Sequence, residues 1–217
     1  MDVEQARFNM VEQQIRPWEV LDPQVLALLF AVKREDFVPV VYQSLAFVDM
    51  EIPLGQGQLM WPPRLEARAL QALQLQRHER VLEVGTGSGY LTALLAAQAG
   101  YVVSVEIHAD LKAEAERKLH AHGVANVQLR GGDAARDWAE DGQFDVIVLA
   151  GSTPVLPEAF LQRLNPGGRL FAIVGEAPVM HAQLVTCVDS GAYRTEILFE
   201  TVVTPLVNAL EPERFVF

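Results

Sequence analysis

The stretch VLEVGTGSGY at residues 81–90 decides the fold class of this chain. A short apolar run ends in three alternating glycines, and an apolar helical pattern, GYLTALLAAQA, follows at once. Glycines at such a strand-to-helix turn let the backbone bend sharply and approach a ligand beside the helix N-terminus. Since a tight turn alone does not require three glycines, we predict a ligand-binding loop. Its candidate contact residues are Gly85, Thr86, Gly87, Ser88 and Gly89.

The glycine spacing narrows the class of ligand. A dinucleotide fingerprint reads G-x-G-x-x-G, whereas here the third glycine comes one residue early and Tyr90 occupies the sixth place. Glu83 lies in the strand just before the glycines, where its charge opposes a passing pyrophosphate but suits a cation such as the amino group of S-adenosylmethionine. We therefore predict S-adenosylmethionine as the cofactor, with a nicotinamide cofactor as the weaker alternative.

Two further acids follow neighbouring strands. Glu106 ends the run YVVSVE about 20 residues beyond the glycines, where a carboxylate can accept hydrogen bonds from both ribose hydroxyls. Asp133, in GGDA after the third strand, either accepts a hydrogen bond from an adenine amino group or caps a turn. Because open α/β sheets bind ligands at the carboxyl ends of their strands, we expect both acids in one cofactor site, beside Ile107 and Ala134.

The chain from residue 80 onward alternates strands with helices. The alternation continues to the helical run PEAFLQRL (157–164), which NPGG stops, and to the strand RLFAIVG (169–175). This order predicts right-handed crossovers and an α/β, doubly wound, mostly parallel sheet. Two β-prone runs then flank DSGAY (189–193) with no helix between them, so we predict a C-terminal antiparallel hairpin that completes the sheet.

The first 79 residues read as an N-terminal helical and loop extension that covers the active site, ahead of the cofactor-binding domain at 80–217. Two short helices are predicted, broken near Pro17 and restarted at Asp22, a capping residue before Pro23. Residues 34–58 predict irregular structure with short strands, and residues 64–76 predict an amphipathic helix. Whether this extension moves as a lid, and which oligomer the chain forms, stay open.

Composition disfavours several classes of function. The chain has 217 residues, 50% of them hydrophobic, and a formal net charge of -11, so we expect a substantial core and no nucleic-acid partner. The apolar run VLALLFAV (25–32) is too short to span a bilayer, and no membrane partner is expected. One cysteine, Cys187, cannot form an internal disulfide, which favours the cytoplasm. The histidines form no convincing metal-ligand pattern, so no metal is predicted.

These motifs together resemble the class I S-adenosylmethionine-dependent methyltransferases, which implies a seven-stranded, Rossmann-like sheet. Over nearly its whole length the chain is similar to the protein-L-isoaspartate O-methyltransferases, because MVEQQI, REDFVP, IPLGQGQ, VLEVGTGSGY, FDVIVLAG, LNPGGRL and VTPLV occur in the same order. IPLGQGQ together with REDFVP is the more specific part of this resemblance. It implies methyl transfer to the carboxylate of isoaspartyl residues in damaged protein.

The loop GQGQLMWPPR (55–64) departs from that family pattern. After GQGQ the family normally reads Thr-Ile-Ser-x-Pro, and its serine is implicated in catalysis, whereas this chain has Leu59, Met60 and Trp61 there. The catalytic residue therefore stays unassigned, and Trp61 either walls the acceptor pocket or packs in the core. The candidate substrate-side residues are Gln58, Leu59, Trp61 and Ser152.

The altered loop leaves three hypotheses for the function. The resemblance implies a protein or peptide substrate that carries a carboxylate. A small-molecule acceptor that stacks against Trp61 is the first alternative. A domain that binds S-adenosylmethionine without catalysing a reaction is the second.

Overall fold

The N-terminal segment folds into helices that are broken near a proline, as predicted. The computed structural model describes residues 2–138 and 142–212. Pro17 lies where the first helix ends, and the Asp22 side chain caps the next helix by accepting hydrogen bonds from its first amides. The helical segments are α1 (Val3–Asn9), a π-helical stretch (Met10–Ile15), a 3-10 turn (Arg16–Trp18) and α2 (Pro23–Ala31).

A hairpin and one helix connect this segment to the sheet. The hairpin pairs Ile52 with Met60, and its tip carries the two glycines of GQGQ. Pro63 begins the helix, where its missing N–H costs no hydrogen bond. The elements are 3-10 turns at Arg34–Asp36 and Val40–Leu45, strands β1 (Ile52–Gly55) and β2 (Gln58–Met60), and helix α3 (Pro63–Leu73). The predictions of short strands and of an amphipathic helix are confirmed.

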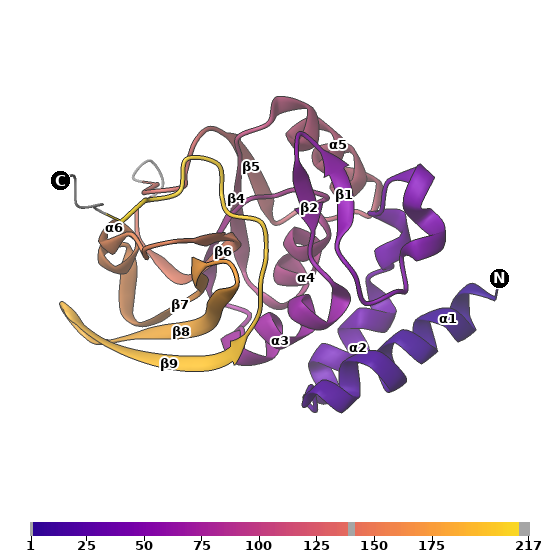
Figure 1. Cartoon of the computed structure of the whole chain (residues 1–217), viewed down its shortest axis with the longest axis horizontal. Helices are drawn as coiled ribbons and strands as arrows, with labels where there is room; N and C mark the ends of the chain where they lie inside the picture. The colour runs from indigo at the N-terminus through magenta and orange to yellow at the C-terminus, as the bar shows by residue number, and fades with distance from the viewer. Residues whose placement is uncertain (1, 139–141, 213–217) are drawn as a thin grey trace.

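Seven strands form one mostly parallel sheet, which confirms the predicted fold class (Figure 1). They lie in the order β5-β4-β3-β6-β7-β8-β9; the pairs β7–β8 and β8–β9 are antiparallel, and the other neighbouring pairs are parallel. The strands are β3 (Arg80–Val84), β4 (Tyr101–Glu106), β5 (Val127–Gly131), β6 (Phe144–Thr153), β7 (Leu164–Glu176), β8 (Val179–Asp189) and β9 (Ala192–Glu200). Helices α4 (Tyr90–Gln98), α5 (Ala109–Ala121) and α6 (Glu158–Gln162) lie between consecutive parallel strands.

The sheet separates two hydrophobic cores. Alternation along β3 sends Val81 into the larger core and Leu82 and Val84 into the other. Ile15 and Leu29 of the N-terminal segment belong to the larger core, together with residues of α3 and α4. Since one core spans residues on both sides of position 79, the division of the chain into 1–79 and 80–217 stays a prediction.

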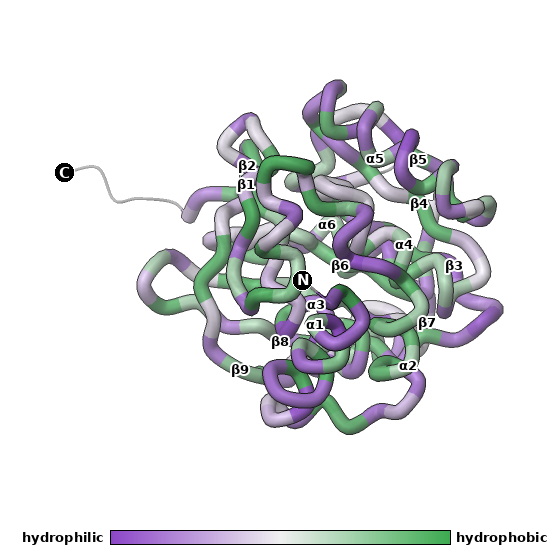
Figure 2. Tube along the Cα trace, turned by 90° about the vertical axis from the view of Figure 1, so that its right-hand side faces the viewer, coloured by the Kyte–Doolittle hydropathy of each residue, from purple (hydrophilic) through white to green (hydrophobic). Residues whose placement is uncertain are grey.

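Hydrophilic stretches lie mainly along the outer helices, as the purple turns of α1 and α5 show in Figure 2. On α5, ion pairs join Lys112 to Glu116 and Arg117 to Glu114 across its exposed face. Within residues 2–138 and 142–212, no helix has both the length and the hydropathy to cross a membrane.

The NPGG segment differs from its prediction. Helix α6 ends at Gln162, and β7 begins at Leu164 and runs through NPGG instead of starting after it. A bulge absorbs the extra residues, because Leu164 pairs with Phe144 and Arg169 pairs with Val146. Gly168 permits this bulge, since a Cβ there would lie 2.8 Å from the carbonyl oxygen of Asn165.

Candidate functional site

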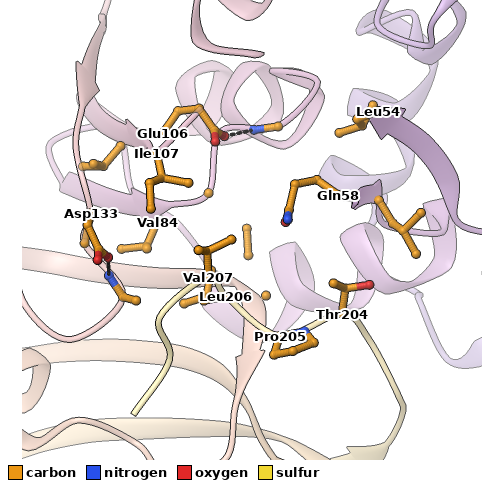
Figure 3. A pocket seen from close by; sticks show the side chains of 18 of the residues that line it. Leu54, Gln58, Val84, Glu106, Ile107, Asp133, Thr204, Pro205, Leu206 and Val207 are labelled. Carbon is orange, nitrogen blue, oxygen red and sulfur yellow. Dashed lines mark hydrogen bonds between the residues drawn. The ribbon is translucent and has the colours of Figure 1, made fainter. Parts of the chain in front are cut away.

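A cleft with about 660 Å³ of empty space, part of it open to solvent, lies at the carboxyl ends of the central strands. Hairpin β1–β2 supplies one wall, and the segment that follows β9 supplies another. Figure 3 shows Asp133 and Glu106 toward one end of the cleft and Gln58 and Thr204 toward the other. The predicted residues Gly85, Gly87, Glu106, Ile107, Asp133 and Ala134 all line this cleft, as do Gln58, Leu59 and Trp61.

The glycine loop turns through left-handed backbone conformations that favour glycine. Gly85 has a φ of 97°, and its N–H donates to the carbonyl of Val105 in the neighbouring strand β4. Gly89 has a φ of 82° and precedes the first residue of α4, where a Cβ would lie only 3.2 Å from the Cβ of Ala115. The turn therefore brings bare backbone to the cleft and packs the helix closely against α5.

Glu106 presents a fixed carboxylate to the cleft. One carboxylate oxygen accepts a hydrogen bond from the N–H of Gly87 at 2.8 Å, and the other accepts one from the N–H of His108 at 3.0 Å. The side chain is 4% exposed, so these two backbone bonds hold it in place. A carboxylate has about four acceptor positions, so two stay available for a pair of ribose hydroxyls.

Asp133 is held by the chain that follows β9. Its carboxylate accepts a hydrogen bond from the N–H of Ala135 at 3.0 Å and one from the side-chain amide of Asn208 at 2.8 Å. Asn208 is fixed in turn, because its carbonyl accepts a hydrogen bond from the side chain of Arg136. The orientation of Asp133 toward the cleft therefore depends on contacts from a distant part of the sequence.

Glu83 does not line the cleft, and its predicted contact with the ligand stays a prediction. It lies in the middle of the structure with no exposed surface. One carboxylate oxygen accepts hydrogen bonds from the hydroxyls of Thr92, at 2.5 Å, and Ser104, at 2.6 Å, and the other has no partner among the described residues. Alternation along β3 explains this position, because Glu83 shares the face of Val81 and points toward α4. Glu83 supports the glycine loop from below.

Three of the predicted loop residues also lie below the cleft surface. The hydroxyl of Thr86 is hydrogen-bonded to Ser104 at 2.6 Å, and the hydroxyl of Ser88 accepts a hydrogen bond from the N–H of Tyr90. Thr86 and Ser88 border a smaller cavity of about 300 Å³ next to the cleft. Gly89 lines neither of these two cavities; it is the N-cap residue that precedes α4.

The buried Glu83 makes the stability of the fold depend on pH. Burial, reinforced by the charge of Glu106, raises the pKa of Glu83 from 4.5 to about 8, against the opposing hydrogen bonds of Ser104 and Thr92. Between these values the folded state holds a proton that the unfolded state releases. The stability that a neutral Glu83 adds to the folded state is therefore complete below the pKa of Glu83 in the unfolded state. It is lost as the pH rises toward about 8.

We expect Glu83→Gln to gain stability relative to the native protein as the pH rises from about 5 to about 8, by about 1 to 3 kcal/mol, because glutamine cannot ionise. Urea unfolding at several pH values across this interval measures the change. Glu116→Gln, on the exposed face of α5, is the matched control and keeps a constant difference from the native protein. A constant difference for Glu83→Gln as well would contradict the buried, neutral carboxyl.

Ser152, predicted as a substrate-side residue, does not line the cleft, and its contact with a substrate stays a prediction. It is fully buried, and its hydroxyl donates to the carbonyl of Val203 at 3.0 Å. Its backbone N–H donates to the carbonyl of Thr204, and its own carbonyl accepts from Leu206. Ser152 therefore holds the returning chain against β6, and Thr204 lines the cleft instead.

The loop after the hairpin contributes to the end of the cleft that lies away from Asp133. Trp61 is 5% exposed, belongs to the larger core and meets the ring of Phe171 edge-on at 6.2 Å, yet it also lines the cleft. Both predicted roles of Trp61 therefore apply. Arg34, fully buried, donates to the carbonyls of Trp61 and Ala46 and pairs with the carboxylate of Glu66. This network fixes the loop.

Sequence reasoning missed the residues that approach the cleft from a distance. The segment after β9 contributes Thr204, Pro205, Leu206 and Val207, for which VTPLV was the available signal.

Glu51 also lines the cleft, and continuing the β1–β2 register by one residue places it opposite Trp61. One Glu51 oxygen is buried without a partner among the described residues, and burial raises the pKa of this carboxyl. No sequence pattern pointed to it.

Comparisons with known proteins agree with this geometry. Residues 5–211 match the family model described as Protein-L-isoaspartate(D-aspartate) O-methyltransferase (PCMT). The chain is 44% identical over 169 residues to protein-L-isoaspartate O-methyltransferase 1 of Rhodopseudomonas palustris (strain HaA2), which covers 78% of this chain and 69% of that protein. It is 37% identical over 204 residues to the protein-L-isoaspartate O-methyltransferase of Yersinia enterocolitica, covering 93% and 96%.

The fold has a close counterpart among solved structures. A proposed protein-L-isoaspartate O-methyltransferase from Plasmodium falciparum, in complex with S-adenosyl-L-homocysteine, superposes with a TM-score of 0.81 over 95% of this chain and 99% of that one. At 20% sequence identity this likeness concerns the fold alone. In the part of the chain that the structure describes, no group of three or more His, Cys, Asp or Glu side chains is arranged to hold a metal ion.

Proposed function

The chain belongs to the protein-L-isoaspartate O-methyltransferase family and is an S-adenosylmethionine-dependent methyltransferase, and from this premise we propose that it methylates the free carboxylate of isoaspartyl residues in proteins and peptides. One observation carries the proposal. A single cleft joins an acid-lined end at Glu106 and Asp133 to a second end at hairpin β1–β2. Cofactor and acceptor can therefore meet inside it.

Each end of the cleft has groups that fit the cofactor's parts. We assign the ribose hydroxyls to Glu106, whose free acceptor positions face the cleft, and the adenine amino group to Asp133. Ile107 and Ala134 flank the adenine, and the backbone of Gly85 and Gly87 approaches the amino-acid part. Glu83 acts indirectly, through Thr92 and Ser104 beneath the glycine loop.

The reaction needs little acid–base catalysis from the protein. S-adenosylmethionine, when bound, supplies an electrophilic methyl group whose bond to sulfur breaks as a carboxylate oxygen bonds to its carbon. An isoaspartyl carboxylate is ionised near neutral pH, because its pKa resembles that of an α-carboxyl group, about 3.5. The residues at the acceptor end therefore have to exclude water and align one oxygen, and no general base is needed.

The charge of Glu51 bears on this step. An ionised Glu51 repels an incoming carboxylate, whereas a neutral one does not. Because burial raises the pKa of Glu51, its neutral form becomes easier to reach when an acceptor carboxylate fills the cleft. The unpartnered carboxyl is therefore compatible with an anionic acceptor.

A methyl-transfer assay tests the proposed function. We expect label from S-adenosylmethionine to reach an L-isoaspartyl peptide at least about 100-fold faster than the same peptide with L-aspartate, because only one carboxylate position aligns with the methyl group. Base-labile release of the label identifies a methyl ester. Equal labelling of both peptides, or none while calorimetry shows cofactor binding, would contradict the proposal.

A small carboxylate-bearing molecule is the second candidate acceptor. Leu59 and Trp61 give the acceptor end an apolar wall, and an indole face favours a flat partner. Aromatic carboxylic acids in the same assay test this candidate.

We also propose that the protein acts in the cytoplasm, which the single, buried, free cysteine supports.

A further inference from the structure

The acceptor end of the cleft requires a hydrogen-bond donor that the loop at residues 59–61 does not supply as a hydroxyl. A carboxylate held for in-line attack keeps one oxygen on the methyl carbon, and its second oxygen needs a donor once water is excluded. Leu59 and Met60 have no donor, and Trp61 carries only an indole N–H on a ring packed in the core. The donor has to be sought elsewhere along the wall.

Thr204 is the one hydroxyl-bearing side chain among the described residues that line the cleft. Other nearby hydroxyls are committed, since Ser152 donates to the carbonyl of Val203 and Thr153 to that of Val155. The Gln58 amide also lines the cleft; one of its two N–H groups donates to the carbonyl of Gln56, and the other stays a second candidate donor. The Thr204 hydroxyl makes no hydrogen bond with any residue in the described ranges and is thus available to a ligand.

The backbone of Thr204 is held on both sides. Its carbonyl accepts a hydrogen bond from the N–H of Ser152 at 3.1 Å, and Pro205, which follows it, forms a bridge with Ser152 and restricts Thr204 to extended conformations. Ser152 and Leu206 close the next hydrogen bond along this contact at 2.9 Å. A donor on such a segment needs little reorganisation when the acceptor arrives.

We propose that the Thr204 hydroxyl donates a hydrogen bond to the acceptor carboxylate, and that Ser152 positions it by holding the chain on either side of Thr204. The proposal rests on the proposed isoaspartyl methylation. Figure 3 shows Thr204 on the same side of the cleft as Gln58, away from Asp133. On this side the cleft is lined by hairpin β1–β2 and by the returning chain.

The test compares two substitutions of Thr204, one that removes the hydroxyl and one that retains it. Thr204→Val keeps the branched shape and removes the donor, whereas Thr204→Ser keeps the donor. We expect Thr204→Val to lower kcat/KM for an isoaspartyl peptide by about 10- to 100-fold, mainly through kcat, and Thr204→Ser to stay within about threefold of native. Calorimetry should show S-adenosylmethionine binding unchanged within about twofold in both.

Matched controls separate the proposal from a general loss of structure. Thr195→Val makes the same change on the exposed face of β9 and is expected to leave kcat and KM unaltered. Native activity in Thr204→Val, or equal impairment of Thr204→Val and Thr204→Ser, would overturn the role of the Thr204 hydroxyl. Neither result would contradict the proposed function. A native protein that methylates no isoaspartyl peptide would overturn the proposed function, and this inference with it.

Discussion

Replacement of Glu106 by alanine is expected to weaken S-adenosylmethionine binding by about 100- to 10,000-fold. Two hydrogen bonds from ribose hydroxyls to a charged acceptor contribute about 1.5 to 3 kcal/mol each, and alanine removes both. It also releases the N–H of Gly87, which donates to the carboxylate at 2.8 Å, and so loosens the glycine loop. Titration calorimetry of the native protein and the variant measures the loss.

Two further variants show which part of Glu106 matters. Glu106→Gln keeps an acceptor for Gly87 but loses the charge and half of the acceptor positions, so its affinity should fall between native and alanine. Glu116→Ala removes an equal charge from the surface of α5 and should bind the cofactor normally. Affinity within about threefold of native for Glu106→Ala, at unchanged folding stability, would contradict its assignment to the ribose.

Features governed by local sequence were predicted well. The glycine loop, the cap at Asp22, the alternation of strands and helices and the hairpin at DSGAY all follow from patterns within about 15 residues. Glu106 was placed correctly for the same reason, because a residue at the end of a parallel strand must lie at the ligand-binding edge.

Features that depend on distant contacts were not predicted. Glu83 lies one strand residue before the turn, and its sequence does not say that Thr92 and Ser104 occupy the face to which it points. Ser152 was expected just after a strand, but β6 extends through it to Thr153, and the chain after β9 returns and covers it. The same return places Thr204 and Leu206 in the cleft. Only the tertiary path of the chain determines these positions.

The burial of Trp61 predicts the second large effect. The ring is 5% exposed and packs edge-on against Phe171, and the backbone carbonyl accepts a hydrogen bond from the buried Arg34 at 2.7 Å. Trp61→Ser is expected to lower the free energy of unfolding by about 3 to 5 kcal/mol, because it removes a large apolar group and leaves a cavity beside the cleft. Urea denaturation measures this loss.

Trp61→Phe is the matched control for the packing argument. A phenyl ring fills most of the same space, so its loss of stability should be about 1 to 2 kcal/mol. The Arg34 hydrogen bond goes to the backbone and is present in both variants. A Trp61→Ser protein as stable as Trp61→Phe would contradict the burial of the indole.

The effect of residue 61 on catalysis requires a different pair of variants, because a variant of lower stability can still have a higher rate. Trp61→Ala and Trp61→Ser open nearly the same cavity and differ by one hydroxyl. Deletion of an oxyanion-hole donor in a protease costs about 3 kcal/mol, so a serine donor that reaches the acceptor should raise kcat/KM of Trp61→Ser at least about tenfold above Trp61→Ala. If the two variants react equally while both exceed the native rate, the indole limits turnover by its bulk. Equal rates at the native level would show that a hydroxyl at position 61 does not reach the acceptor and that the indole does not limit turnover.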